Sequence, residues 1–427
     1  HFLASLASFA LAVPLMPAHH HLATRFDWTA DPAEVSLRIT AVLIRAPTFE
    51  IQEWVRLINP AFKPIPVNAS YADNAKLGVI PEVSEFPIMN RFYSEDPAEK
   101  QKVVDQVRES CLYNGFFQIL GHSVPVDKQA KALQCAKKLF NLPLEEKEKV
   151  SKNNNTWNRG YEMLRSQILE EGTQPELKEG FYIGDEIPKS HPYFVNKKLN
   201  SGPNQWPEAL GDDLEDFKYQ TMDYYRSTLR LASDLMRVLA LSLDLKEDYF
   251  STFLDGAVAT MRLLHYPSQP KDADEKLTRG IGAHTDFGAI TMLLQDDVDG
   301  LQVWDQKNNT WIDVQPTKGA FVVNLGNLMA RWTNEKYKSN VHRVINKTGK
   351  ERYSIPVFVS GNPDYVVDCI PTCKAPGEEA KFKPATVEEV VSASYAESYG
   401  RAQLYKQGLE KKAESKVEST PLQQVAA

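Results

Sequence analysis

Apolar residues recur at two different spacings along this chain, and the spacing changes near residue 257. Residues 97–113, 128–140 and 214–243 carry apolar side chains at helical intervals, and in the longest of these Phe217, Leu231, Leu235 and Leu239 form one face. From about residue 257 to residue 363, short runs rich in β-branched and aromatic residues are separated by glycines, a pattern typical of strands. The pattern predicts a β-rich core flanked by helices.

Shorter patterns predict further elements around that core. Residues 86–89, with a proline near their start, are predicted to form an edge strand, and residues 115–120 a buried strand. His122 follows the buried strand and is interpreted as a structural histidine. Residues 159–181 are expected to form loops and strands at the mouth of a site. Thr386 and Glu389 have the spacing of a capping box, which predicts a helix reaching about Lys406.

The composition is that of an ordinary globular protein, with 42% hydrophobic and 25% charged residues in 427. A net charge of −7 offers no basic surface, so no nucleic-acid partner is expected. The four cysteines lack the CxxC pairs of zinc sites and are expected to be free thiols in a reducing compartment. Residues 2–15 are apolar, but they are too short to span a membrane and no Lys or Arg precedes them. A cytoplasmic location without a membrane partner is therefore expected.

Three residues in the β-rich region are candidates for holding one metal ion. His284 and Asp286 are two positions apart, so in a strand both side chains would point to the same face. His342 lies in a second β-rich segment, residues 340–345. Two imidazoles and a carboxylate on neighbouring strands form the facial triad that holds non-haem Fe(II) and leaves the opposite coordination positions open. A His-x-Asp pair also arises often by chance.

A candidate anion site lies ten residues beyond His342. Arg352 and Ser354 are two positions apart, among Pro356 and Phe358 on the same face of a predicted strand. An arginine that points into an apolar interior is costly unless it meets an anion. A guanidinium fork and a hydroxyl are suited to a carboxylate. The order of metal ligands and clamp therefore indicates a site for an acidic cosubstrate that chelates iron.

These motifs together resemble the Fe(II)- and 2-oxoglutarate-dependent dioxygenases, and within them the isopenicillin N synthase-like branch of plant and fungal secondary-metabolism oxygenases. The resemblance covers roughly residues 84–400. It rests on His284-Thr285-Asp286, Gly300-Leu301-Gln302-Val303, Val323-Asn324-Leu325-Gly326, Trp332-Thr333-Asn334, His342-Arg343-Val344 and Arg352-Tyr353-Ser354, with Asn114-Gly115-Phe116-Phe117-Gln118-Ile119 and His122-Ser123-Val124-Pro125 upstream. It implies a mainly β fold with flanking helices and a double-stranded β-helix (jelly-roll) core, in which the site lies between two packed sheets.

The resemblance also implies the chemistry and the residue roles. A small organic metabolite would be oxidised by hydroxylation, desaturation or ring closure, with O2 consumed, succinate and CO2 released, and ascorbate as a candidate reductant. His284, Asp286 and His342 would be the catalytic Fe(II) ligands, while Arg352, Ser354 and Tyr266 would bind 2-oxoglutarate. Plant members often have Asn where this chain has Leu264, so that contact is absent here. Substrate contacts are expected from Arg159, Tyr161, Phe181 and Phe358.

The same resemblance divides the chain into regions. Residues 1–83 form an unmatched extension, 84–250 the N-terminal helix and strand region, 251–365 the jelly-roll core, 366–410 a C-terminal helical segment and 411–427 a disordered tail. A monomer is expected.

Three other functions stay open at this point. An oxidase of the same branch that does not use 2-oxoglutarate could use the arginine clamp for its own substrate's carboxylate. A zinc hydrolase could use the same three ligands, although no positioned general base accompanies them. A binding protein could keep the ligands without catalysis, although the complete triad argues against it.

Overall fold

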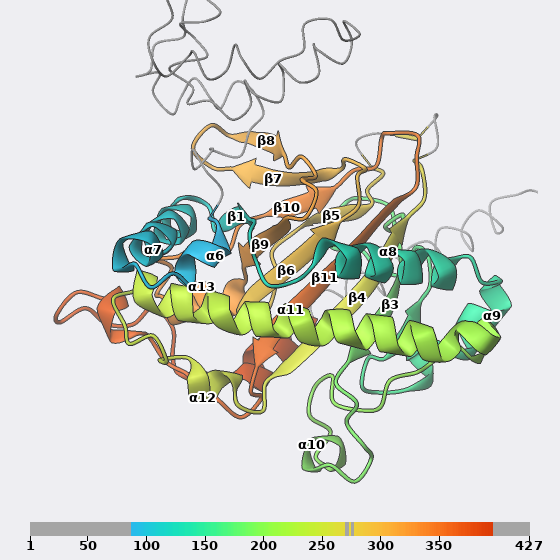
Figure 1. The fold of residues 1–427 in the computed structure, drawn as a ribbon, viewed down its shortest axis with the longest axis horizontal. Coiled ribbons are helices and arrows are strands. Elements are labelled where there is room, and N and C mark those ends of the chain that lie inside the picture. Colours follow the sequence, from blue (N-terminus) through green and yellow to red (C-terminus); the bar gives the residue numbers. More distant parts are fainter. Residues whose placement is uncertain (1–86, 270–272, 275–276, 396–427) are drawn as a thin grey trace, which may run out of the picture. The chain divides into compact units, whose positions relative to one another are not determined.

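The computed structural model describes residues 87–269, 273–274 and 277–395. Its centre is a pair of β-sheets, one of seven strands in the order β1-β9-β6-β11-β4-β3-β2 and one of four in the order β5-β10-β7-β8 (Figure 1). Every pairing between named strands is antiparallel. The antiparallel jelly-roll arrangement predicted for residues 257–363 is confirmed.

The strands of the larger sheet come from both ends of the described chain. They are β1 (Phe116–Ile119), β2 (Gly160–Glu162), β3 (Glu179–Gly184), β4 (Val258–Tyr266), β6 (Ile290–Gln295), β9 (Phe321–Leu325) and β11 (Arg352–Gly361). The smaller sheet consists of β5 (Ile281–His284), β7 (Leu301–Asp305), β8 (Thr310–Asp313) and β10 (His342–Val344), and a separate pair is formed by β12 (Val366–Val367) and β13 (Ala385–Thr386). Because β1, β2 and β3 precede residue 251, the larger sheet joins two of the regions predicted from the sequence.

Helices cover one face of the larger sheet, and the longest of them, α11, runs across it (Figure 1). The labelled helices are α6 (Met89–Phe92), α7 (Pro97–Tyr113), α8 (Val126–Phe140), α9 (Leu144–Lys149), α10 (Pro192–Val195), α11 (Leu214–Ser242), α12 (Ser251–Leu254) and α13 (Asn327–Trp332), with short 3-10 turns at Lys152–Asn154, Glu208–Asp213 and Pro371–Cys373. The helices predicted at residues 97–113, 128–140 and 214–243 are therefore confirmed. None of the described helices is long and apolar enough to cross a membrane.

Two hydrophobic cores lie on the two faces of the larger sheet. The core under the helices contains Leu231 and Leu235 of α11 together with Ile355 and Val357 of β11, all fully buried. The second core is smaller and contains residues from both sheets: Phe116, Leu264, Tyr266, Ile281, Leu301, Val303, Val322 and Val344 among them. The polar residues of interest lie on this second face.

The edge strand predicted at residues 86–89 is wrong for the described part of that segment. Ile88 makes a single parallel bridge to Leu120, and the helix α6 begins at Met89. Met89 and Phe92 are both buried in the helix-side core, and a spacing of three positions on one face is a helical spacing. Residues 86–89 are too few for the spacing of their apolar positions to distinguish a strand from a helix.

The capping box predicted near residue 386 is confirmed. Glu389 N–H donates to Thr386 Oγ1 at 3.2 Å, and Thr386 N–H donates to Glu389 Oε2 at 2.8 Å. A helix begins at Val387. Its predicted end near Lys406, the predicted disordered tail and the extension of residues 1–83 lie outside the described residues.

Candidate metal centre and cosubstrate site

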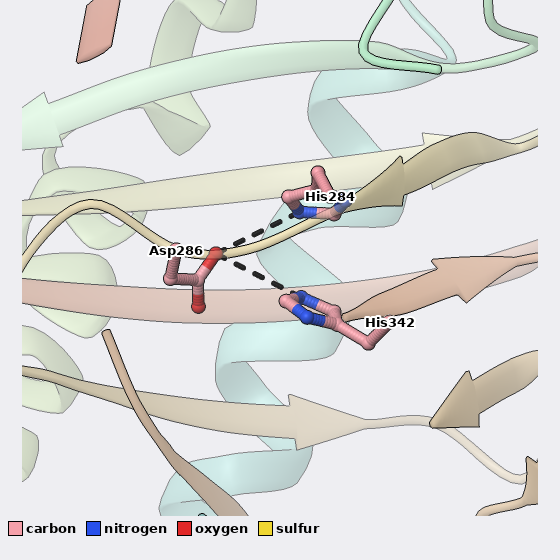
Figure 2. Close-up of side chains that lie close together, drawn as sticks. All are labelled: His284, Asp286 and His342. Carbon is pink, nitrogen blue, oxygen red and sulfur yellow. Dashed lines mark ion pairs between the residues drawn. The ribbon is translucent and has the colours of Figure 1, made fainter. Parts of the chain in front are cut away.

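Two strands of the smaller sheet bring the candidate metal ligands together. His284 ends β5 and lies directly opposite His342 of β10 in the register of the two strands. The sequence pattern placed Asp286 on the same strand as His284. In the structure it lies two residues past the end of β5. Its Oδ1 is 3.6 Å from His284 Nε2 and 3.7 Å from His342 Nε2, and all three side chains face one point (Figure 2). Among the described residues, this is the group of His, Cys, Asp and Glu side chains arranged to hold a metal ion.

Hydrogen bonds fix the orientation of the Asp286 carboxylate. Thr291 Oγ1 donates to Oδ2 at 2.6 Å and Asn324 Nδ2 donates to the same oxygen at 2.7 Å. The other oxygen, Oδ1, is thereby left to face the two imidazoles. Burial raises the pKa of Asp286, but the neighbouring histidines and these two hydrogen bonds outweigh burial, so that its pKa lies below its usual value. The carboxylate is therefore ionised at neutral pH.

A backbone carbonyl contacts Nδ1 of each imidazole and so leaves Nε2 as the nitrogen that faces the metal position. His284 Nδ1 lies 2.8 Å from the Gly282 carbonyl oxygen, and His342 Nδ1 lies 3.3 Å from the Asn340 carbonyl oxygen. Because a carbonyl only accepts, each Nδ1 carries the proton and each Nε2 keeps its lone pair. Burial lowers the pKa of His284, and burial together with repulsion from His284 lowers the pKa of His342 to about 4. The trio is thus neutral imidazole, neutral imidazole and carboxylate, the donor set that non-haem Fe(II) takes.

The candidate cosubstrate clamp lies on β11 and β4. Arg352 is fully buried, its Nε donates to the Val298 carbonyl oxygen at 3.2 Å, and its Nη2 donates to Gln295 Oε1 at 2.7 Å. Nη1 is buried and has no acceptor among the described residues. A buried charged donor without an acceptor is costly, so the guanidinium fits a bound carboxylate.

Two hydroxyls stand beside that guanidinium. Arg352 and Tyr266 are register partners on neighbouring strands, and the Arg352 Cζ lies 4.9 Å from the Tyr266 ring centre. Ser354 Oγ donates to Tyr266 Oη at 3.4 Å. The structure therefore brings together the three side chains predicted to bind 2-oxoglutarate, and they fit its carboxylate.

The four residues predicted to touch the substrate do not share one location. Phe358 lies on the same face of β11 as Arg352 and is the register partner of Thr291, which binds Asp286. Tyr161 and Phe181 belong to the helix-side core, on the other side of the larger sheet from Phe358, and their substrate contact stays a prediction. Arg159 is fully buried and donates to a backbone oxygen of Asn200 at 2.6 Å.

Sequence reasoning missed several polar residues around the site. Thr291 and Asn324 orient Asp286, and Gln295 orients Arg352. Arg262 of β4 and Glu162 of β2 form a buried ion pair of 2.5 Å. The available signal was an amide or charged side chain within a largely apolar strand, such as Asn324 in residues 321–325 or Arg262 in residues 258–266. This was the argument that identified Arg352.

Comparisons with known proteins agree with this geometry. The family model of the 2OG-Fe(II) oxygenase superfamily matches residues 257–361, and that of the N-terminal region of non-haem dioxygenases in morphine synthesis matches residues 87–209. The chain is 60% identical over 324 residues to the 2-oxoglutarate-Fe(II) type oxidoreductase hxnY of Emericella nidulans, covering 76% of this chain and 93% of the relative. It is 38% identical over 313 residues to the 2-oxoglutarate-dependent dioxygenase traH of Penicillium crustosum, covering 72% and 90%.

Solved structures show the same likeness. Crystal structures of one full-length Neurospora crassa protein, in complex with alpha-KG and either 5-formyluracil or thymine, superpose with a TM-score of 0.63. They are 29% and 28% identical to this chain, covering 73% and 72% of it and 94% and 95% of their own length. The alternatives of a zinc hydrolase and of a protein without catalysis find no support among these relatives. The chain is an Fe(II)- and 2-oxoglutarate-dependent dioxygenase that belongs to the 2OG-Fe(II) oxygenase superfamily.

Proposed function

We propose that this dioxygenase binds one Fe(II) through His284, Asp286 and His342 and holds 2-oxoglutarate through Arg352, with Ser354 and Tyr266 beside it. The observation that carries the proposal is the buried Nη1 of Arg352, which lacks an acceptor among the described residues on the same sheet face as the Asp286 contacts. The bound iron and cosubstrate supply the activation of O2 and the oxidative decarboxylation that yields succinate and CO2.

The chain's own residues bind and orient the reactants. Asp286 and the two neutral imidazoles would hold the metal through three protein ligands and leave room for cosubstrate, substrate and O2. Arg352 offers a charged donor to the far carboxylate of 2-oxoglutarate, and the hydroxyls of Ser354 and Tyr266 add weaker donors. Burial of this clamp excludes water, which strengthens each of these contacts.

The inward face of β11 and its neighbours supports a proposal for the class of substrate. Phe358 presents an aromatic ring beside the residue that holds Asp286. Tyr182 and Arg262 lie further along the same face, with the Arg262 Cζ 4.4 Å from the Tyr182 ring centre. An aromatic surface next to fixed polar groups suits a small, flat molecule with polar edges. The 5-formyluracil and thymine bound in the Neurospora crassa structures support this proposal.

We further propose a cytoplasmic monomer that acts on small molecules without a nucleic-acid partner. The net charge of −7 supports the absence of nucleic acid. Light scattering after size-exclusion chromatography tests the monomer, and a mass of twice 48.2 kDa would refute it.

Turnover of 2-oxoglutarate without the main substrate tests the cosubstrate assignment. Purified protein is incubated with Fe(II), ascorbate, O2 and labelled 2-oxoglutarate, and succinate is followed against a matched Arg352→Ala variant. Wild type is expected to form succinate and the variant almost none. If wild type forms none and calorimetry shows no anaerobic binding of 2-oxoglutarate to the iron-loaded protein, an oxidase that does not use 2-oxoglutarate replaces the proposal.

A further inference from the structure

The strand that carries His284 contains a bulge just before this ligand. In the pairing of β5 with β10, His284 lies opposite His342, and Ile281 lies opposite Val344. Three steps along β5 therefore correspond to two steps along β10, so β5 has one extra residue in this interval. Such bulges occur next to active sites, where they redirect a side chain. A redirected ligand needs other contacts to hold it in place.

Two carboxylates from a distant loop bind the backbone of the bulge. Gly282 N–H donates to Glu176 Oε1 at 2.9 Å, and Ala283 N–H donates to Glu170 Oε2 at 2.9 Å. Both glutamates belong to residues 163–178, the loop between β2 and β3. This loop lies directly on the strand, because a Cβ added to Gly282 would come within 2.6 Å of the Glu170 backbone nitrogen. The absence of a side chain at Gly282 permits this approach.

One peptide group connects Glu170 to the metal ligand. The peptide between Gly282 and Ala283 donates its N–H to Glu170 and accepts the Nδ1–H of His284 at its carbonyl oxygen, 2.8 Å away. A negative charge at the N–H end of a peptide polarises it and makes its carbonyl a stronger acceptor. We propose that Glu170 is a positioning residue for His284, acting through the peptide group between Gly282 and Ala283. The proposal rests on the metal-binding role proposed above for His284.

Glu170 is itself fixed in a position from which it can act. Arg279 Nε donates to Glu170 Oε2 at 2.9 Å and Nη2 donates to Oε1 at 3.3 Å. Arg279 lies only three residues before Gly282. Glu170 therefore joins the loop to this segment at two places, through the ion pair with Arg279 and through the hydrogen bond from Ala283 N–H. Carboxylates that hold a metal-binding histidine fix its ring and raise its basicity. Here the same effect passes through a peptide group, so the loop sets both the orientation and the donor strength of His284.

Binding of Co(II) in place of iron tests the proposal without relying on activity. Anaerobic calorimetry measures Co(II) affinity in the wild type and in Glu170→Gln, Glu170→Ala and Glu171→Gln, while the visible spectrum of the saturated protein reports the ligand field. Glu171 is the exposed neighbour of Glu170, so its variant controls for the loss of one loop charge. The glutamine variant keeps an acceptor for Ala283 N–H but not the charge, and alanine keeps neither.

The expected result is a graded loss at Glu170 alone. Removing a partner of a metal-binding histidine typically costs about 10- to 100-fold in metal affinity. The loss of Co(II) affinity in Glu170→Ala should approach the upper end of this range. Glu170→Gln should lose about 10-fold in Co(II) affinity and show a shifted visible spectrum. Glu171→Gln should match wild type in both measurements. Binding of 2-oxoglutarate to the Co(II)-saturated variants should be unchanged, because its clamp lies on β11 and β4.

Each contrary result has a distinct meaning. Unchanged affinity and spectrum in both Glu170 variants, with wild type binding one Co(II), overturns the positioning role but leaves the metal site intact. An equal loss in Glu171→Gln also overturns it, since any loop charge would then suffice. Failure of wild type to bind one Co(II) refutes the metal site itself. If thermal unfolding shows that Glu170→Ala does not fold, the outcome for Glu170→Gln decides.

Discussion

The two faces of the larger sheet are both buried, yet they differ in what they carry. On β11, Tyr353, Ile355, Val357 and Val359 point to the helices and join one large apolar core. On the same strand, Arg352, Ser354 and Phe358 point the other way, toward the smaller sheet. One strand therefore contributes alternately to stability and to chemistry. The difference shows that the helices give the sheet enough apolar burial for its other face to hold costly polar groups.

The comparison is tested most severely by replacing one histidine on each side of the larger sheet: His284, on the smaller sheet that faces it, and His265, on its helix side. His284→Ala should abolish activity and weaken Fe(II) binding by more than the roughly 10- to 100-fold typical of losing a ligand's hydrogen-bond partner. His265→Ala, on the helix side, removes a side chain bound to Glu179 at 2.7 Å. It should lower the free energy of unfolding by about 1–3 kcal/mol and leave the iron content unchanged.

Elemental analysis and thermal unfolding of both histidine variants provide the measurement. Stoichiometric iron retained in His284→Ala would refute the ligand assignment. Loss of iron in folded His265→Ala would show that the two faces are not independent.

The next largest effect is expected at Arg352. Arg352→Ala leaves the cosubstrate's carboxylate without its main donor, which typically costs about 2–5 kcal/mol, or some tens- to thousands-fold in the apparent KM for 2-oxoglutarate. Arg352→Lys should recover only part of this, because an ammonium keeps the charge and loses the fork. Steady-state kinetics measure the apparent KM for 2-oxoglutarate in both variants, and iron titration measures their iron affinity. An equal loss of iron affinity in the alanine variant would contradict a role limited to the cosubstrate.

Neighbouring residues of β11 allow a sharper test of alternation. Ile355 is fully buried on the helix side, so Ile355→Ala should lower the free energy of unfolding by about 2–5 kcal/mol without changing the KM for 2-oxoglutarate. Ser354→Ala should have the opposite effect: the free energy of unfolding stays unchanged and the KM for 2-oxoglutarate rises about 10-fold. Chemical denaturation and kinetics on both variants separate the effects. Identical profiles for the two variants would rule out the division of labour.

The smallest effect concerns two thiols in the helix-side core. Burial raises the pKa of Cys135 to about 11 and also raises the pKa of Cys111, so at pH 8 only about one Cys135 side chain in a thousand is thiolate. Both should resist iodoacetamide in the native protein, while the half-buried Cys369 and Cys373 react sooner. Mass spectrometry of the labelled peptides, with retained activity as the control, measures this. Equal labelling of all four would mean that the helix-covered face opens readily.

The contrast between the faces also explains which sequence predictions succeeded. On β11, two polar residues at i and i+2 fixed which side of the strand faces the site. β2 and β3 are buried along their whole length on both faces, so hydrophobic alternation carries no information about direction there. The sequence therefore could not show that Tyr161 and Phe181 point to the helix-side core, while their neighbour Tyr182 points the other way.

Convergence of the metal ligands could be predicted, but its local geometry could not. The spacing of His284 and Asp286 indicated one shared face, and His342 was predicted to join them from a second β-rich segment, as the register of β5 with β10 now shows. The bulge just before His284 is hydrogen-bonded to carboxylates more than a hundred residues earlier, Glu170 and Glu176. A local pattern cannot contain a contact made across such a separation.

The place of β11 has a consequence for how the protein is made. β11 lies in the larger sheet between β6 and β4, both of which precede it in the chain. While the ribosome synthesises the protein, these two strands emerge with open edges and cannot be joined until residue 361 has left the exit tunnel. Open apolar strand edges invite wrong pairing and aggregation. We expect the nascent chain to depend on chaperones until that moment, because β11 is the last strand of the larger sheet to be synthesised and it fills the gap between β6 and β4.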